Sequence, residues 1–272
     1  MEPSGPVGSP GEGVESAPHI EPAFELRGVS RFFNGSRALE AINLGVLPGE
    51  MIALIGPSGA GKTTLLNLLN GSLPPSAGEV RVAGRDLSQL SAQALRQVRG
   101  EIGTVYQQFH LVDNLQVIHN VNAGMLGRWS VLKAIMSLIQ PLNVEAARHA
   151  LAQVGIPHKL YARTGRLSGG EQQRVALARV LMQNPAAVLA DEPISSVDPE
   201  HGRGIMDLLR SLNRQRGRTV IVSLHTVKYA YSHCDRIVGL RQGRVEFDLP
   251  PSAVSPEMRA ALYQTEVEEN IP

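Results

Sequence analysis

A glycine-rich segment early in the chain has the residue types and the spacing of a phosphate-binding loop. Residues 56–63 read Gly-Pro-Ser-Gly-Ala-Gly-Lys-Thr, after the apolar run 51–55 and before the apolar-rich segment 64–69. A strand, a glycine-rich turn and a helix in this order direct backbone N–H groups and the positive helix end at phosphate oxygens. The lysine of this pattern reaches the β- and γ-phosphates, and the next hydroxyl coordinates Mg²⁺. The alternative is an ordinary glycine-rich turn, but the full match favours a nucleoside triphosphate site made of Gly56, Pro57, Ser58, Gly59, Ala60, Gly61, Lys62, Thr63 and Thr64.

A second segment, residues 167–174, reads Leu-Ser-Gly-Gly-Glu-Gln-Gln-Arg and has the features of a helix start. Ser168 can cap the helix, and Glu171 stands three positions later, where a capping box needs an acidic side chain. Apolar residues continue the helical pattern until Asn184-Pro185, where it should end. The start of such a helix is also a favourable place for an anion. Taken alone, the segment is equally compatible with a capped helix that follows a glycine turn.

Together the two segments resemble the ATP-binding cassette family, whose signature reads LSGGQ. Glu171 stands where glutamine is more usual, and the resemblance extends from about residue 24 to residue 251. It implies ATP as the nucleotide and a head-to-tail dimer of two copies. In that dimer Ser168, Gly169, Gly170 and Glu171 of one copy cover the γ-phosphate bound by the other.

An acidic pair, Asp191 and Glu192, directly follows the apolar run 187–190. Carboxylates at the C-terminal end of a parallel strand lie at the edge of the sheet where ligands bind. We expect Asp191 to organise the Mg²⁺ shell and Glu192 to act as the general base on the attacking water, while Lys62 neutralises charge on the phosphates. The alternative is a solvated acidic pair at the end of a strand.

Two further roles depend on the resemblance. Gln107 matches the glutamine of the family that contacts Mg²⁺ and water, although the adjacent Gln108 leaves the register open by one residue. His225 matches the histidine that hydrogen-bonds the γ-phosphate. Without the resemblance, a surface glutamine and a structural histidine at a strand end are the expected interpretations.

The resemblance also assigns Phe33 to stacking on the adenine ring and Asp198 to a loop that crosses the dimer interface. Phe32 competes with Phe33, and either ring could instead belong to the core. Asp198-Pro199 could equally be the N-cap of a helix with proline at its first position.

Composition argues against several other classes of protein. The 272 residues include 26 Lys and Arg against 25 Asp and Glu, so the net charge of +1 favours neither nucleic acid nor an anionic membrane. Aromatic residues make up only 4%, which argues against base stacking as the main function. Cys234 is the single cysteine and fits a reducing compartment. No apolar run approaches the roughly 18 residues that cross a bilayer, so we expect any membrane role to depend on a partner.

The apolar pattern predicts an α/β fold: a P-loop domain with a mixed, largely parallel core sheet, a small antiparallel β-subdomain and a helical subdomain. Alternating apolar residues near 24–26, 42–46 and 80–82 predict the antiparallel strands. Continuous apolar runs at 186–190 and 220–224 predict strands of the parallel sheet.

We expect a disordered tail over residues 1–22 and the ATPase domain over residues 23–252, with the helical subdomain at about 108–182. A helical region without strands is predicted over roughly residues 87–181, and it includes the stretches 94–98, 130–139 and 144–154. Residues 253–272 should form a C-terminal helix followed by an acidic tail, and Gln242-Gly243 should form the turn of a preceding hairpin.

Within the family, the chain is most similar to the ATP-binding subunits of phosphonate importers, over residues 120–129, 223–230 and 235–248. The resemblance implies an ATP-hydrolysing motor at the cytoplasmic face of the bacterial inner membrane. Its partners would be two transmembrane permease subunits and, indirectly, an extracytoplasmic solute-binding protein. Phosphite, hypophosphite, phosphate or another small solute remains an alternative cargo. A soluble cassette ATPase acting on DNA and a small-molecule kinase are the alternatives from other classes.

One apolar stretch has two interpretations. It could form a docking face for a coupling helix of the permease, or it could be part of the core of the helical region, and it consists of Trp129, Val131, Leu132, Ile135 and Leu138.

Overall fold

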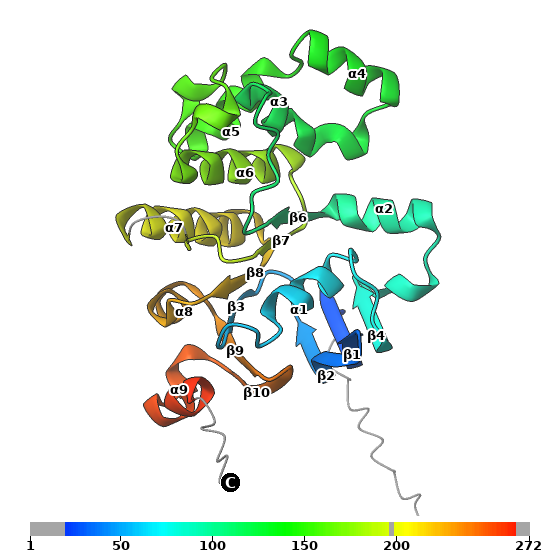
Figure 1. Cartoon of the computed structure of the whole chain (residues 1–272), viewed down its shortest axis with the longest axis vertical. Coiled ribbons are helices and arrows are strands. Elements are labelled where there is room, and N and C mark those ends of the chain that lie inside the picture. Colours follow the sequence, from blue (N-terminus) through cyan, green and yellow to red (C-terminus); the bar gives the residue numbers. More distant parts are fainter. Residues whose placement is uncertain (1–19, 196–198, 265–272) are drawn as a thin grey trace, which may run out of the picture.

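A six-stranded, largely parallel sheet lies at the centre of the computed structural model, which describes residues 20–195 and 199–264 (Figure 1). The strand order is β10-β9-β3-β8-β7-β6, and every neighbouring pair is parallel except β10 with β9. All residues of β3, β7 and β8 are buried, as expected for parallel strands covered on both faces. The six strands are β3 (Met51–Ile55), β6 (Ile102–Val105), β7 (Ala187–Ala190), β8 (Thr219–Leu224), β9 (Arg236–Arg241) and β10 (Arg244–Leu249).

A second, antiparallel sheet in the order β2-β1-β4-β5 packs beside the first. Its apolar side chains share a core with helix α1 and with Ile52 and Leu54 of β3, whereas Met51, Ala53 and Ile55 face the core on the other side. This alternation is the period of two that a strand imposes on its side chains. The antiparallel strands are β1 (Phe24–Phe33), β2 (Ser36–Val46), β4 (Ala77–Val82) and β5 (Arg85–Asp86), and α1 is Lys62–Leu69.

Helices form a separate body above the sheets, coloured green in Figure 1. Its central helix, α6, packs against α3 and α5, while α4 projects at the far end. The body and the helix that leads to it comprise α2 (Ala92–Glu101), α3 (Val117–Asn122), α4 (Val131–Ile139), α5 (Val144–Gln153) and α6 (Gly169–Gln183). The remaining helices, which lie lower in Figure 1, are α7 (Pro199–Arg216), α8 (Val227–His233) and α9 (Pro256–Tyr263).

The predicted strands and the hairpin are confirmed, with Gln242 and Gly243 both at positive φ in the β9–β10 turn. One expectation is wrong, because the region 87–181 is not helical throughout. Strand β6 (Ile102–Val105) interrupts it and pairs with β7 at the edge of the core sheet. Its four residues include Gly103 and Thr104, so the apolar signal is too short and weak to indicate a strand. Most of the predicted N-terminal tail, the acidic C-terminal tail and Asp198 lie outside the described residues.

Across residues 20–195 and 199–264, none of the helices combines the length and the apolar character required to cross a membrane. Burial raises the pKa of the Cys234 thiol to about 12, so this cysteine is a buried, protonated group of the core.

An ion pair ties α7 to the core sheet. Arg210 donates two hydrogen bonds to the Asp235 carboxylate, at 2.8 and 2.6 Å, and the Met51 backbone N–H donates a third at 2.9 Å. Burial by itself raises the pKa of Asp235, but these hydrogen bonds outweigh it and the pKa is lowered. A lowered carboxyl pKa means that the ionised form stabilises the fold.

We expect Asp235→Asn to lower the free energy of unfolding at pH 7 by about 1 kcal/mol, a value reduced for the partial exposure of the carboxylate. The difference from wild type should persist at any pH above the unfolded pKa of about 3.9. It should shrink as the pH falls through the lower folded pKa. Urea unfolding from pH 7 to pH 3 measures it, with Glu246→Gln on exposed β10 as the control. A difference that stays constant over this range would contradict the assignment.

Candidate functional site

The glycine-rich loop connects β3 to α1 and passes so close to neighbouring backbone that two of its glycines are required. A Cβ at Gly56, where φ is +149°, would lie 2.0 Å from the Leu240 carbonyl oxygen. A Cβ at Gly61, where φ is +103°, would lie 2.7 Å from the Ala38 carbonyl oxygen. The loop therefore packs tightly against the backbone of β9 and β2, an approach that only glycine allows at these two positions.

Lys62, at the start of α1, directs its ammonium group into this loop. The Nζ atom donates to the carbonyl oxygens of Gly56, at 2.8 Å, and of Pro57, at 3.0 Å, and the residue is only 5% exposed. Burial lowers the pKa of Lys62, while Glu192 and Asp191 act in the opposite direction. The lysine is thus close enough to the acidic pair for their charges to interact, and the neighbouring Thr63 is exposed at the first turn of α1.

Asp191 and Glu192 are joined through one buried hydroxyl at the ends of β7 and β8. Ser223 Oγ donates to Asp191 Oδ1 at 2.7 Å and accepts a hydrogen bond from the Glu192 backbone N–H at 2.8 Å. The Asp191 N–H in turn donates to the Val105 carbonyl of β6 at 2.8 Å. The acidic pair is therefore held by three neighbouring strands, and the alternative of a solvated pair does not describe the buried Asp191.

The side chain of Glu192 receives partners from two other strand ends. Gln107, just after β6, donates from Nε2 to Glu192 Oε2 at 3.1 Å, and His225 Nε2, just after β8, lies 2.5 Å from Glu192 Oε1. Glu192 itself has a φ of +49°, a strained conformation for a residue with a side chain. The structure thus brings together Lys62, Asp191, Glu192, Gln107 and His225, and of the two adjacent glutamines it is Gln107 that contacts Glu192.

Helix α6 holds the segment that follows Gln107. Arg179 of α6 donates to the carbonyl oxygens of Phe109 and His110, each at 2.8 Å. Burial lowers the pKa of the Arg179 guanidinium, and Tyr106 opposes that shift. Phe109 and His110 both have positive φ values, so these contacts maintain an unusual turn. A movement of α6 would therefore be transmitted to Gln107.

The predicted helix start at residues 168–171 is confirmed. Ser168 Oγ accepts from the Glu171 N–H at 3.3 Å, Glu171 Oε2 accepts from the Ser168 N–H at 2.9 Å, and Lys159 pairs with Glu171 at 3.0 Å. These contacts lower the pKa of Glu171. Ser168 and Gly169 are exposed, and in the described part of the chain no hydrogen bond or ion pair joins 168–171 to the glycine-rich loop. Figure 1 shows α6 in the upper body and α1 in the lower one.

Phe33 and Phe32 are exposed by 43% and 46%, so neither belongs to the core. The guanidinium of Arg31 lies 4.6 Å from the centre of the Phe33 ring. Stacking of Phe33 on adenine stays a prediction, and so does the role of Asp198.

Sequence reasoning missed three residues of this region. Ser223 had a signal, because it is the polar residue within the apolar run 220–224. Arg179 had none, because its contacts are with backbone atoms distant in sequence. Tyr263 of α9 also had none: burial raises its pKa, and a hydrogen bond from the Gly56 backbone opposes this shift, so the C-terminal helix reaches the loop.

The donor set at the loop suits Mg²⁺ that is bound together with a nucleotide. Among the described residues, no group of three or more His, Cys, Asp or Glu side chains could hold a metal ion by itself. Mg²⁺ commonly uses one or two carboxylates, and phosphates, water and other oxygens complete its octahedron. The oxygens of Asp191, Thr63 and Gln107 fit this arrangement.

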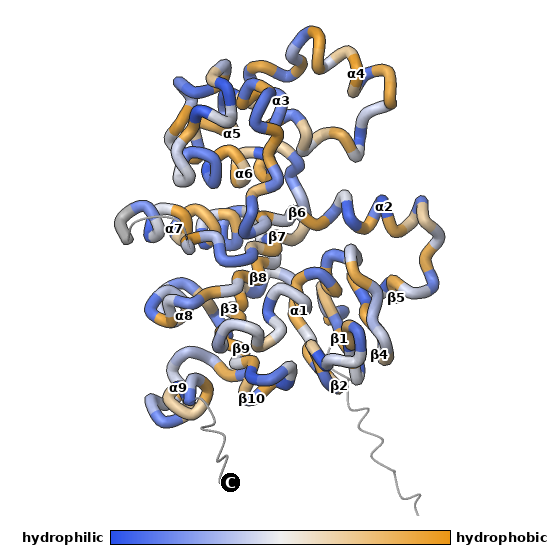
Figure 2. The backbone as a smooth tube through the Cα atoms, in the orientation of Figure 1, coloured by the Kyte–Doolittle hydropathy of each residue, from blue (hydrophilic) through white to orange (hydrophobic). Residues whose placement is uncertain are grey.

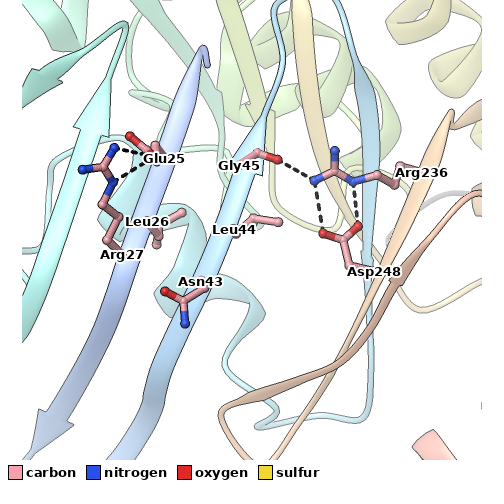
Figure 3. Close-up of a pocket in the computed structure, with 8 residues that line it drawn as sticks. All are labelled: Glu25, Leu26, Arg27, Asn43, Leu44, Gly45, Arg236 and Asp248. Carbon is pink, nitrogen blue, oxygen red and sulfur yellow. Dashed lines mark hydrogen bonds and ion pairs between the residues drawn. The ribbon is translucent and has the colours of Figure 1, made fainter. Parts of the chain in front are cut away.

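A shallow hollow elsewhere, between β1–β2 and β9–β10, does not belong to the site (Figure 3). Its charged groups pair with one another: Arg236 with Asp248 at 2.6 Å, and Arg27 with Glu25 at 2.8 Å. Arg236 also donates to the Gly45 carbonyl at 2.5 Å. The charged groups of this hollow are therefore already paired within the fold.

Comparison with known proteins identifies the class. The sequence matches the ABC transporter family over residues 39–195, and the chain belongs to that family. It is 46% identical over 252 residues to the phosphonates import ATP-binding protein PhnC of Cupriavidus pinatubonensis, which covers 91% of this chain and 90% of that one. It is 45% identical over 246 residues to the PhnC protein of Rhizobium johnstonii, which covers 89% and 87%.

Solved structures agree with this assignment. The dimeric structure of MJ0796, a bacterial ABC transporter cassette, has a TM-score of 0.75 and 32% identity, and covers 84% of this chain and 98% of that one. A post-hydrolysis dimer of the same cassette, bound to ADP and Pi, has a TM-score of 0.73 and 31% identity over the same shares. The predicted family and fold class are therefore confirmed, and the chain is an ATP-binding cassette ATPase.

We expect Ser223→Ala to lower kcat for ATP hydrolysis about tenfold, because it removes the donor to Asp191 and the acceptor for the Glu192 N–H. A lost hydrogen bond to a charged group costs about 1.5–3 kcal/mol. Steady-state ATPase assays and urea unfolding separate an effect on the site from an effect on the fold. Ser232→Ala, which removes an exposed hydroxyl of α8, is the matched control. A wild-type rate in Ser223→Ala would show that this hydroxyl does not organise the acidic pair.

Proposed function

We propose that this chain is the ATP-hydrolysing subunit of a bacterial importer that takes up phosphonates. One observation carries the catalytic part: Glu192 lies among Gln107, His225 and the Asp191–Ser223 pair. The transport part is supported by 46% identity, over 91% of the chain, to a protein named for phosphonate import.

Hydrolysis follows from the positions of these groups. The loop amides and Lys62 neutralise charge on the β- and γ-phosphates. Thr63 and Asp191 would hold Mg²⁺, which would add to this neutralisation. Glu192 accepts the proton of the attacking water. Gln107 and His225, which contact its carboxylate in the described structure, turn to the nucleotide and leave an oxygen of Glu192 for the water.

The signature segment acts on the nucleotide of a second copy. Ser168, Gly169 and Gly170 begin α6 at an exposed helix end, where N–H groups favour an anion, yet they make no contact with the loop of their own chain in the described residues. A head-to-tail dimer places this helix end over the partner's γ-phosphate. Because the γ-phosphate holds the dimer closed, hydrolysis opens it.

Two permease subunits would bind beside Gln107, on the cytoplasmic face of the inner membrane, and an extracytoplasmic protein would deliver the solute. A cleft between α2 and the helical body supports this placement, since Tyr106 and His110 line it directly after β6. Its basic lining suits a permease segment with acidic or carbonyl groups, and it includes Arg96, Arg99, Arg128 and Arg179.

The cargo can be tested in proteoliposomes that contain this chain and its two permease subunits. We expect the solute-binding protein to stimulate ATP hydrolysis when it carries an alkylphosphonate, and much less when it is offered phosphite or phosphate. An assembly with Glu192→Gln is the control for contaminating ATPases. Equal or stronger stimulation by phosphite or phosphate would replace phosphonate with that anion as the cargo.

The shared active site can be tested by mixing two inactive variants. Glu192→Gln lacks the base and Ser168→Arg lacks the lid, so each homodimer should be nearly inactive. In a mixed dimer, the Ser168→Arg chain still supplies the base Glu192, and the Glu192→Gln chain still supplies the lid residue Ser168. These two residues meet at one of the two sites, so we expect the mixture to recover ATPase activity.

The matched control mixes wild type with the double variant Ser168→Arg/Glu192→Gln, whose mixed dimers have no intact site. If each chain completed its own site, the first mixture would stay inactive, while the second would keep the activity of its wild-type chains. That pattern would contradict the proposal.

A further inference from the structure

Helix α4 is amphipathic, but its apolar face is exposed to solvent. Ser137 is the one buried residue of α4, and its hydroxyl donates to the carbonyl of the half-buried Ala134 at 2.7 Å. The large apolar side chains of α4 span an arc of about 160° at 3.6 residues per turn. They face outward, with exposed fractions of 77% for Val131, 69% for Leu132, 54% for Ile135, 54% for Met136, 57% for Leu138 and 83% for Ile139. The sequence-based alternative of a core position is therefore wrong for Val131, Leu132, Ile135 and Leu138, whereas Trp129 is half-buried.

We call the exposed apolar face of α4 the ridge. Figure 1 shows α4 at the far end of the helical body, and Figure 2 shows it as an apolar segment at that end. A single helix with an exposed apolar face does not by itself form the groove that a coupling helix of a permease would need. The neighbouring cleft does, and Arg128, which lines it, directly precedes Trp129 and α4. The ridge thus follows, along the chain, directly after a residue that lines the surface where we place the permease.

The ridge lies in a stretch without acidic residues. Between Asp113 and Glu145 the sequence has no Asp or Glu, whereas it contains Arg128 and Lys133. The Lys133 ammonium lies 5.4 Å from the centre of the Trp129 ring. An apolar arc bordered by a tryptophan and basic side chains is the pattern of a helix that lies in a membrane interface and prefers anionic lipids.

We propose that α4 inserts its apolar face into the interface of an anionic phospholipid membrane next to the permease. The orientation rests on the proposed function, because the permease brings the cleft, and with it the ridge, to the bilayer. Insertion buries the outward apolar side chains among acyl chains, while Arg128 and Lys133 remain with the phosphate headgroups. The binding of a single short helix is weak, so it adds to permease binding and does not replace it.

The test uses the full chain and vesicles without any other protein. We expect the chain to sediment with vesicles of phosphatidylglycerol and phosphatidylcholine, and much less with phosphatidylcholine alone. Trp129 is the only tryptophan in the sequence, so its emission should shift to the blue on binding. Leu132→Glu/Ile135→Glu should lower the bound fraction at least tenfold, and Lys133→Gln should weaken binding only to the anionic vesicles.

The matched control is Leu47→Glu/Val112→Glu, which adds the same two charges at exposed apolar positions outside α4 and should bind like wild type. ATPase activity and thermal unfolding check that every variant is folded. Absence of wild-type binding, or equal binding by Leu132→Glu/Ile135→Glu, overturns the proposal. The proposal is also overturned if Leu132→Glu/Ile135→Glu binds vesicles like wild type but no longer binds the detergent-solubilised permease. The ridge would then be a protein interface. The mixed-dimer and proteoliposome assays report on the proposed function independently.

Discussion

The Ser223 hydroxyl is the contact on which the order of the site depends. A carboxylate as buried as Asp191 needs a donor, and Ser223 provides one while it also accepts the N–H of Glu192. Because β7 and β8 are adjacent and parallel, Asp191 after β7 and Ser223 near the end of β8 lie at the same edge of the sheet. The strained φ of Glu192 is maintained there, and it directs the carboxylate toward Gln107 and His225. A single network, anchored on the buried Ser223 and Asp191, therefore joins groups from three strand ends.

Helix α6 links this network to the rest of the molecule. Its first turn carries the capped signature residues, and Arg179 at its middle holds the backbone after Gln107. The same segment, through Tyr106 and His110, lines the basic cleft. A rigid helix with these attachments allows a movement at the cleft, at the signature end or at the acidic pair to reach the other two. This connection is what a motor driven by nucleotide requires.

Local patterns predicted much of this, and long-range contacts account for the rest. The loop at 56–63 and the start of α6 were predictable because each motif is contiguous and its chemistry follows from its spacing. Arg179 and Tyr263 were not, since their partners are backbone atoms far away in sequence. Strand β6 was missed because four residues with a glycine carry little periodicity. The outward face of α4 could not be predicted, because an amphipathic pattern does not say which face the fold covers.

The surface of α4 also shows why a net charge describes a protein poorly. A balance of +1 over the whole chain argued against an anionic membrane as a partner. That average hides a stretch from Asp113 to Glu145 with basic residues and no acidic ones between its ends. Attraction to a charged bilayer falls off within about 10 Å at ordinary salt, so only the charges nearest the surface count. Exposure of so many apolar side chains is costly in water. The fold buries Ser137 and exposes Ile139, so the outer face of α4 suits an apolar partner such as the membrane interface.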